Sequence, residues 1–321
     1  MIDGSHVLIT GANGFVGRHL CDALKIKGSR ITRLVRSLHY ETESEGETIV
    51  LDLADRKKTI HIISDLQPDF VIHLAGSKER INAGKQFRVS YDTNITVSLN
   101  VAEACLNLTN FKRLVFLGSC DEYGPLSSPY HETQQELPVN TYGLSKLAVT
   151  KFLLALYHSC QFPAVVLRPT VIYGPNQGNE MFLSSLIYTL LHKKEFAMTS
   201  GDQFRDFVYV GDVVEAIIKA LYADIHVNGE IFNIGAGLSY QVKKIALSVA
   251  ELISSDSNMR IKYGALQYRT NESMAYSVDI KKATELLEWK PCTSLGDGLQ
   301  HTITHFSKKL YTEMSAFTRH A

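Results

Sequence analysis

The sequence lacks the features that mark membrane, secreted or nucleic-acid-binding proteins. Its 321 residues carry a formal net charge of zero at pH 7, so we expect no nucleic acid partner. No apolar run approaches the ~20 residues that cross a bilayer, so no membrane association is expected. The chain enters a β-rich run almost at its first residue, so we also expect no signal peptide.

Cysteine is scarce, at five residues in the chain. An odd number of scattered cysteines without zinc-ligand spacing argues against a disulfide framework and against a metal site. We therefore expect a cytoplasmic protein with reduced thiols and no bound metal. The five are Cys21, Cys105, Cys120, Cys160 and Cys292.

What the sequence does contain is a regular alternation of β-rich and amphipathic stretches. Residues 6–10 read as a strand, 15–27 as a helix and 29–35 as a second strand, which is a βαβ unit with a right-handed crossover. The continued alternation predicts an α/β fold with a Rossmann-type, doubly wound parallel sheet. The further expected strands are 48–51, 70–74, 114–118 and 164–167, with helices at 94–106 and 142–158.

The pattern changes after Pro175, where shorter elements predict a smaller, discontinuous C-terminal substrate domain. The substrate is expected in the cleft between the two domains, above the carboxyl ends of the strands. The expected elements are helices at 181–192 and 213–222, an extended stretch at 204–210 and a late strand of the main sheet at 231–234. The predicted boundaries are 1–175 plus about 211–235 for the large N-terminal domain, and 176–210 plus 236–321 for the smaller substrate domain.

Three glycines separate the first strand from the first helix. Gly11 permits a tight turn, Gly14 lets the backbone approach a pyrophosphate at the helix N-terminus, and Gly17 lets the helix pack closely on the strand. The strand-turn-helix context predicts a dinucleotide-binding turn. The residues expected around the cofactor here are Gly11, Asn13, Gly14, Phe15, Val16 and Gly17.

The end of the second strand carries no carboxylate that would hold the adenosine ribose. Residues 33–37 instead contain Arg33 and Arg36. Arg36 either accepts a 2′-phosphate, which favours NADP, or is a solvated surface side chain. Asp52 and Leu53, after the third strand, are expected beside the adenine.

Tyr142 and Lys146 form a YxxxK pair at the start of an expected helix. The i,i+4 spacing places both side chains on one face, one turn apart. A phenol ordinarily titrates near ~10, and a neighbouring ammonium lowers that pKa. Tyr142 is therefore predicted to be a general base near neutral pH, with Lys146 beside it and bonded to the cofactor ribose.

With these motifs and others over nearly the whole chain, the sequence resembles the extended short-chain dehydrogenase/reductases, the NAD-dependent epimerase/dehydratase family. The resemblance implies a nucleotide-sugar-modifying enzyme that holds NAD and forms a homodimer. The matching motifs are residues 11–17, 52–53, 71–76, Asn94, 100–105, 119–124, Tyr142 with Lys146, 167–175, 205–212, 232–235, Asp279 with Lys282, and 287–291.

The resemblance also implies roles for single residues. Ser119 would bond the sugar hydroxyl that is oxidised, and Lys78 would lie beside the sugar. The cofactor contacts that it adds are Leu74, Ala75, Gly76, Asn94, Pro169 and Val171, the last standing where the family often has asparagine. The nucleotide contacts that it adds are Arg205 and Arg269 on the diphosphate, Glu272 on the nucleoside ribose, and Asn179 and Phe182 near the nucleotide.

Residues 119–124 bear on the reaction. Simple 4-epimerases of the family usually have small neutral residues here, whereas 4,6-dehydratases have Thr-Asp-Glu. This chain has Ser119, Cys120 and Asp121, followed by Glu122. A thiol titrates near ~8.5, so Cys120 can protonate a departing hydroxide. Either Asp121 or Glu122 can remove the proton at C5.

The thiol-carboxylate set resembles dehydratases of this family that act on UDP-N-acetylglucosamine in antibiotic biosynthesis. The resemblance implies oxidation at C4, loss of water across C5–C6, and re-reduction at C4, with NAD recycled in each turnover. Three alternatives stay open: a UDP- or CDP-hexose 4-epimerase, a 4-ketoreductase that uses NADPH as co-substrate, and a nicotinamide-sensing binding protein.

Overall fold

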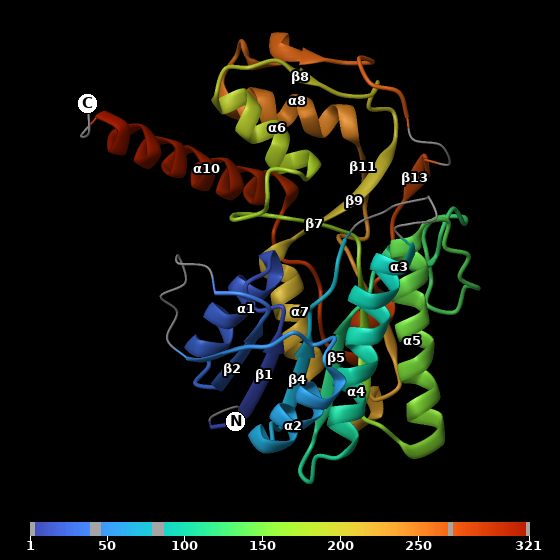
Figure 1. Cartoon of the computed structure of the whole chain (residues 1–321). Helices are drawn as coiled ribbons and strands as arrows, with labels where there is room; N and C mark the ends of the chain where they lie inside the picture. Colours follow the sequence, from blue (N-terminus) through green and yellow to red (C-terminus); the bar gives the residue numbers. More distant parts are fainter. Residues whose placement is uncertain (1–3, 39–45, 79–86, 269–271, 319–321) are drawn as a thin grey trace.

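A seven-stranded parallel sheet forms the centre of the protein (Figure 1). The computed structural model describes residues 4–38, 46–78, 87–268 and 272–318. The strand order β10-β6-β5-β4-β1-β2-β3 reverses direction between β1 and β4, as in a doubly wound fold, which confirms the predicted class. The strands are β1 (His6–Thr10), β2 (Arg30–Val35), β3 (Glu47–Val50), β4 (Phe70–His73), β5 (Arg113–Leu117), β6 (Ala164–Pro169) and β10 (Ile231–Ile234).

Helices cover both faces of this sheet, so its central strands are buried on both sides and read as continuous apolar runs. Helices α1 and α7 enclose one hydrophobic cluster with β1, β4 and β10. Helices α2, α4 and α5 enclose the other. The helices are α1 (Phe15–Ile26), α2 (Arg56–Leu66), α3 (Phe87–Ser90), α4 (Val97–Leu106), α5 (Thr141–Cys160) and α7 (Val210–Tyr222).

A second group of elements lies beyond the carboxyl ends of the sheet (Figure 1). Helices α6 (Phe182–Leu191), α8 (Val242–Ile253) and α10 (Leu295–Thr318) share a third apolar cluster with β9 (Phe204–Tyr209). Helix α10 projects from this group away from the body of the molecule (Figure 1). The remaining elements are β7 (Val171–Tyr173), β8 (Phe196–Ala197), β11 (Ser239–Gln241), β12 (Ile261–Lys262), β13 (Ala275–Tyr276) and α9 (Lys281–Leu286).

The late strand predicted at residues 231–234 is confirmed, because β10 pairs with β6 in the main sheet. The helix predicted around residues 94–106 is present, but its first residues have a different form. Residues Tyr91–Thr96 form a wider π-helical turn, and α4 begins only at Val97. This turn directs the Asn94 side chain into the interior, where it bonds Ser77 and Ser145. Helices α2 and α10 were not predicted, and the division of the chain into two domains stays a prediction.

Candidate active site

The glycine turn lies between β1 and α1 and has the shape that a dinucleotide requires. Gly11 has φ +68°, and a Cβ there would lie 2.7 Å from the backbone nitrogen of Ala75. A Cβ on Gly17 would lie 2.5 Å from the carbonyl oxygen of Gly11. No side chain caps the first turn of α1, and that turn carries no acidic residue. Its backbone N–H groups therefore suit the pyrophosphate of the cofactor.

The residues predicted to contact the adenosine lie at the ends of β2 and β3. Arg36 is exposed, and Asn13 donates from Nδ2 to the carbonyl of Ser37 at 3.2 Å. Asp52 is exposed too and accepts from the Ala54 amide at 3.0 Å, whereas Leu53 is buried in the hydrophobic cluster below the sheet. Leu53 therefore packs in the core, and the contact of Asp52 with the adenine stays a prediction.

The segment after β4 borders the same space. The Leu74 and Ala75 amides both donate to Thr10, to its carbonyl at 3.2 Å and its hydroxyl at 3.3 Å. A Cβ on Gly76 would lie 2.8 Å from Oδ1 of Asn94 and 3.8 Å from Nζ of Lys146. The predicted cofactor residues Gly76, Asn94 and Lys146 therefore converge.

A buried histidine underlies this segment. His73 lies between the hydroxyls of Thr10, 2.7 Å from Nδ1, and Ser98, 2.8 Å from Nε2. Burial lowers the pKa of His73 to about 3, so the ring is neutral at physiological pH. Ser98 in turn donates to the Asn94 carbonyl at 2.5 Å. The chain of hydrogen bonds holds the π-helical turn against β4.

Lys146 is buried one turn below Tyr142 on α5, as the spacing predicts. Its Nζ donates to the Leu117 carbonyl at 2.8 Å and lies 5.9 Å from the centre of the Tyr142 ring. Burial lowers the pKa of Lys146 to about 8, although Glu122 opposes the shift. Tyr142 is only half-buried, so its phenol can meet a ligand while Lys146 stays behind it.

The turn Cys120–Glu122 packs directly against the start of α5. A Cβ on Gly143 would lie 2.4 Å from the Asp121 carbonyl oxygen, so only glycine permits this approach. Asn140 caps α5 by accepting from the Gly143 amide at 2.8 Å and donates to Asp121 at 3.4 Å. The contact brings Ser119 and Asp121 beside the turn of helix that carries Tyr142.

Glu122 is fully buried, and its carboxylate is already engaged. One oxygen accepts from the Ser119 amide at 2.9 Å. The other accepts from Thr150 at 2.9 Å and from Nε of Arg168 at 2.8 Å. The hypothesis that Glu122 is the base at C5 is therefore corrected, because it ties the turn to α5 and β6. Of the two predicted carboxylates, Asp121 is the half-exposed one.

Cys120 lies in the same turn and is 4% exposed. It packs in a small cluster with Tyr123, Tyr130, Tyr276 and Val278. Ser119 caps the turn, since its hydroxyl oxygen accepts from the Asp121 amide at 3.1 Å. The Ser119 hydroxyl keeps its own proton for donation to a ligand.

The comparisons with known proteins agree with this geometry. Residues 7–235 match the profile of the "NAD dependent epimerase/dehydratase family". The chain belongs to this family. NAD is therefore its cofactor, which confirms the prediction, and the protein is an enzyme of the nucleotide-sugar epimerase/dehydratase group.

Its relatives span almost its whole length. It is 30% identical over 314 residues to "Uncharacterized UDP-glucose epimerase YtcB" of Bacillus subtilis, covering 94% of this chain and 98% of that protein. It is 25% identical to human dTDP-D-glucose 4,6-dehydratase over 322 residues, with 95% and 91% covered. The structure of the UDP-glucose 4-epimerase of Thermotoga maritima with UDP-glucose superposes with a TM-score of 0.88 at 26% identity. The superposition covers 95% of this chain and 99% of the epimerase chain.

Among the predicted substrate residues, Arg205 and Glu272 lie together as an ion pair. The Arg205 guanidinium also donates to the Phe204 carbonyl at 2.8 Å and lies 4.9 Å from the centre of the Tyr276 ring. Arg205 is 8% exposed, so it is held firmly. Arg269, the second predicted diphosphate residue, lies outside the described residues.

Asp206 fixes the strand that carries Arg205. Its carboxylate accepts from the amides of Ala236 at 2.7 Å and Gly237 at 3.1 Å, and from the Thr170 hydroxyl at 3.2 Å. These bonds join β9 to the loop after β10. Burial nevertheless raises the pKa of Asp206 to about 6.

The other predicted substrate residues border the space between the two groups of elements. Lys78 and Glu180 form an ion pair, each more than half exposed. Asn179 is exposed beside it, whereas Phe182 packs edge-on against Phe196 in the apolar cluster of the small group. Phe182 is thus placed for packing.

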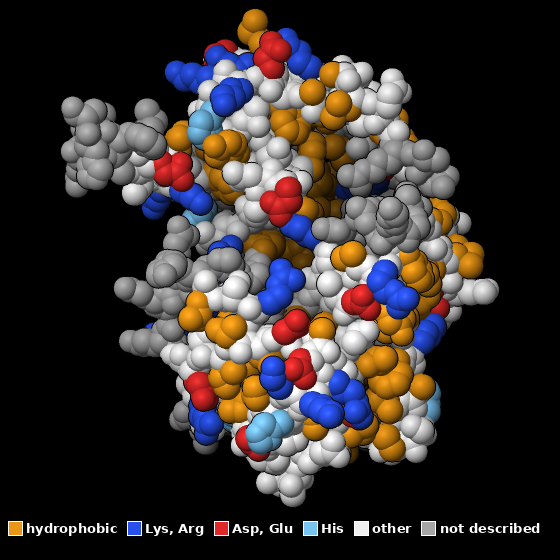
Figure 2. All heavy atoms as spheres, viewed as in Figure 1, with side chains coloured by type: hydrophobic (Ala, Val, Ile, Leu, Met, Phe, Trp, Pro, Cys, Tyr) orange, Lys and Arg blue, Asp and Glu red, His pale blue; other side chains and the backbone are white. Residues whose placement is uncertain are grey.

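Pro169, at the end of β6, is buried, and Val171 lies half-buried in β7. Figure 2 shows a hollow between the α6–α8 group and the main sheet, with hydrophobic side chains on its floor.

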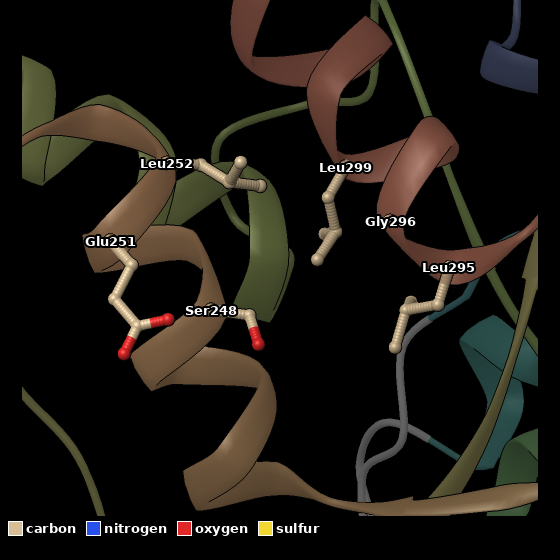
Figure 3. A pocket seen from close by; sticks show the side chains of 6 residues that line it. All are labelled: Ser248, Glu251, Leu252, Leu295, Gly296 and Leu299. Carbon is tan, nitrogen blue, oxygen red and sulfur yellow. The ribbon is translucent and has the colours of Figure 1, made fainter.

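A separate pocket lies between α8 and α10 (Figure 3). It is lined by Ser248, Glu251, Leu252, Leu295, Gly296 and Leu299. Glu251 is its one charged lining residue, and none of the predicted site residues reaches it.

The sequence reasoning missed two residues of the site, Asn140 and His73. Asn140 could have been found, because asparagine directly before an expected helix is a capping signal. His73 could not, since its hydroxyl partners come from β1 and α4. No helix among the described residues is long and apolar enough to span a bilayer. The homodimer and the cytoplasmic location stay predictions.

Proposed function

We propose that the protein is a UDP-N-acetylglucosamine 5,6-dehydratase, the activity used in tunicamycin biosynthesis. The observation that carries the proposal is the turn that follows β5. It contains a buried thiol, Cys120, and a half-exposed carboxylate, Asp121, and it packs against the first turn of α5, which carries Tyr142, while Glu122 is tied to the interior. An epimerase needs no acid and base beyond the tyrosine, whereas an elimination needs both.

The oxidation step uses Tyr142 as the base. Its phenolate takes the proton of the C4 hydroxyl, and Ser119 donates a hydrogen bond to the C4 oxygen. NAD, which the glycine turn Gly11–Gly17 would hold, would supply the acceptor for the C4 hydrogen and its electron pair and the donor for their return. Lys146, held by the Leu117 carbonyl, stabilises the phenolate from behind.

The C4 ketone acidifies C5, and the elimination then needs two proton transfers. Asp121 takes the C5 proton, the C5–C6 double bond forms, and the C6–oxygen bond breaks. Cys120 gives its proton to the leaving hydroxide, which departs as water. One proton is taken and one is given, so a single transfer from Asp121 to Cys120 restores the pair.

Arg205 is the proposed anchor for the diphosphate, because a guanidinium binds phosphate oxygens in a bidentate manner. In the described structure its partner is Glu272. A diphosphate would take the place of Glu272 on Arg205, and Glu272 is proposed to accept from the nucleoside ribose instead. Lys78, exposed on the loop after β4, is proposed to contact the sugar.

The test is incubation of the protein with UDP-N-acetylglucosamine in D2O, followed by mass spectrometry. A product lighter by one water supports the proposal, and an unchanged mass with inversion at C4 contradicts it. Cys120→Ala should lower dehydration by about 10²- to 10⁴-fold, as expected for a lost general acid. Cys105→Ala is the matched control, because Cys105 is a buried thiol in the cluster below the sheet.

A UDP-hexose 4-epimerase is the second candidate. The observation in its favour is that the relative from Bacillus subtilis is described as a UDP-glucose epimerase and the structural neighbour from Thermotoga maritima as a UDP-glucose 4-epimerase. The same experiment separates the two, because an epimerase keeps the mass of its substrate. In an epimerase, Cys120→Ala would leave turnover close to that of the wild type.

A further inference from the structure

A column of three tyrosine rings runs between two arginines, and it joins the turn after β5 to the strand that carries Arg205. The ring centres of Tyr123 and Tyr130 lie 5.0 Å apart, and those of Tyr130 and Tyr276 lie 6.1 Å apart at an interplanar angle of 16°. The guanidinium carbon of Arg168 lies 4.6 Å from the centre of the Tyr123 ring at one end. That of Arg205 lies 4.9 Å from the centre of the Tyr276 ring at the other. None of the five side chains is more than 9% exposed.

Tyr130, the middle ring, is fixed by its own backbone as well as by its hydroxyl. Its amide donates to the Ser277 carbonyl at 2.8 Å, and its carbonyl accepts from the amide of Asp279 at 2.9 Å and from Nδ2 of Asn233 at 3.0 Å. Its hydroxyl donates to the Gly124 carbonyl at 2.8 Å. These bonds tie Tyr130 to the segment after β13 and to the end of the turn that holds Asp121. The column is therefore anchored at both ends and at its middle.

Tyr276 meets Arg205 directly across two paired strands. β13 runs parallel to β9, and Tyr276 lies opposite Arg205 in the register. The guanidinium uses its edge for other partners, since Nη1 donates to the Phe204 carbonyl at 2.8 Å and Nη2 pairs with Glu272. A guanidinium can stack on an aromatic ring by its face while its N–H groups donate along its edge. The ring thus holds the side chain without neutralising its charge, which stays available to an anion.

We propose that Tyr276, supported by Tyr130, is a positioning residue that holds the Arg205 guanidinium in place for the diphosphate of the substrate. The column also fixes Arg205 relative to the turn that carries Asp121, so that diphosphate and sugar are held in one register. Tyr276 acts through Arg205. The inference therefore rests on the proposed role of Arg205 as the diphosphate anchor, and it adds a residue on which that anchor depends.

The test is isothermal titration of the full-length, NAD-loaded protein with UDP and with uridine, which differ only in the diphosphate. The wild type should bind UDP at least about tenfold more tightly than uridine, as expected for charge-assisted contacts. Tyr276→Leu should weaken UDP binding by about 3- to 10-fold and leave uridine binding within about twofold. Tyr276→Phe keeps the ring and should bind UDP as the wild type does. Wild-type UDP affinity in Tyr276→Leu, or an equal loss in Tyr276→Phe, would overturn the inference.

Two further variants guard against a trivial loss of structure. Tyr276→Met keeps most of the apolar volume without an aromatic face, and it should show the same loss as Tyr276→Leu even if the leucine variant does not fold. Tyr263→Leu is the matched control, because Nζ of Lys243 lies 5.2 Å from the centre of the Tyr263 ring, at a place outside the predicted site. UDP binding by Tyr263→Leu should equal that of the wild type. A loss there as large as in Tyr276→Leu would contradict a specific role for Tyr276.

A double-mutant cycle separates this inference from the proposed function. In the Arg205→Gln background, Tyr276→Leu should cause no further loss of UDP affinity, because the side chain that it positions is gone. The same loss in both backgrounds would refute the positioning role while leaving the anchor intact. Arg205→Gln that binds UDP as tightly as the wild type would instead contradict the anchor itself, and the inference would fail with it.

Discussion

Asp121 and Glu122 are adjacent carboxylates whose replacement should have opposite consequences. Glu122 is fully buried and accepts three hydrogen bonds, from Ser119, Thr150 and Arg168. Asp121 is half-exposed, and its carboxylate accepts from Nδ2 of Asn140 at 3.4 Å. We therefore expect Glu122→Gln to destabilise the fold, and Asp121→Asn to leave stability unchanged and to abolish dehydration.

The magnitude follows from the contacts of each carboxylate. Breaking a buried ion pair by removing one partner costs roughly 3–5 kcal/mol. Arg168 keeps a second carboxylate, Glu136, at 2.8 Å, so part of the cost is offset. For Glu122→Gln we expect a loss of about 2–4 kcal/mol in the free energy of unfolding. For Asp121→Asn we expect a change within about 0.5 kcal/mol.

The assay is urea unfolding of both variants at pH 7, with turnover of UDP-N-acetylglucosamine measured on the same samples. Turnover by Asp121→Asn should fall by about 10²-fold or more, as expected for a lost general base. The reasoning would be refuted if Glu122→Gln were as stable as the wild type but inactive while Asp121→Asn remained active. That result would make Glu122 the base.

Three further predictions concern the reactive side chains. Turnover by Tyr142→Phe should fall by at least about 10²-fold, while NAD binding is retained. Binding is measured by the absorbance of the cofactor that stays with the protein through gel filtration. Loss of both the cofactor and the activity would contradict a purely chemical role for Tyr142. Burial lowers the pKa of Lys146 to about 8, whereas a lysine in the unfolded chain titrates near ~10.4. Between these two pH values the unfolded state binds more protons than the folded state. The free energy of unfolding of the wild type should therefore rise with pH across this window, by up to about 3 kcal/mol. Lys146→Met should lack that rise in urea unfolding at pH 7.5 and 10, and an identical rise in the variant would show that Lys146 is not its source. N-ethylmaleimide should label the exposed Cys160 and Cys292 of the native protein rapidly and the buried Cys120 slowly. The labelled positions are identified by peptide mass spectrometry. Rapid labelling of Cys120 would show that its thiol is open to solvent.

Much of the fold was predictable because it depends on local patterns. Each strand and helix, the glycine turn and the YxxxK pair is a local feature of about 20 residues or fewer. The backbone period alone therefore sets which of its side chains share a face. Helix α2 was missed because residues 56–66 are few and show only a weak apolar periodicity. Asn94 was predicted as a cofactor residue but placed on a regular helix, since no sequence signal marks a π-helical turn.

The sequence by itself determined the class of the fold, the cofactor turn and the pair Tyr142 and Lys146. Only the tertiary structure decided between Asp121 and Glu122, because burial and the Arg168 partner on β6 come from segments far apart in the chain. The same holds for Tyr276, which reads as an ordinary strand residue until its burial and its place beside Arg205 are known. Local spacing fixes which side chains share a face, but solvent exposure and charge pairing depend on long-range packing, which spacing does not encode.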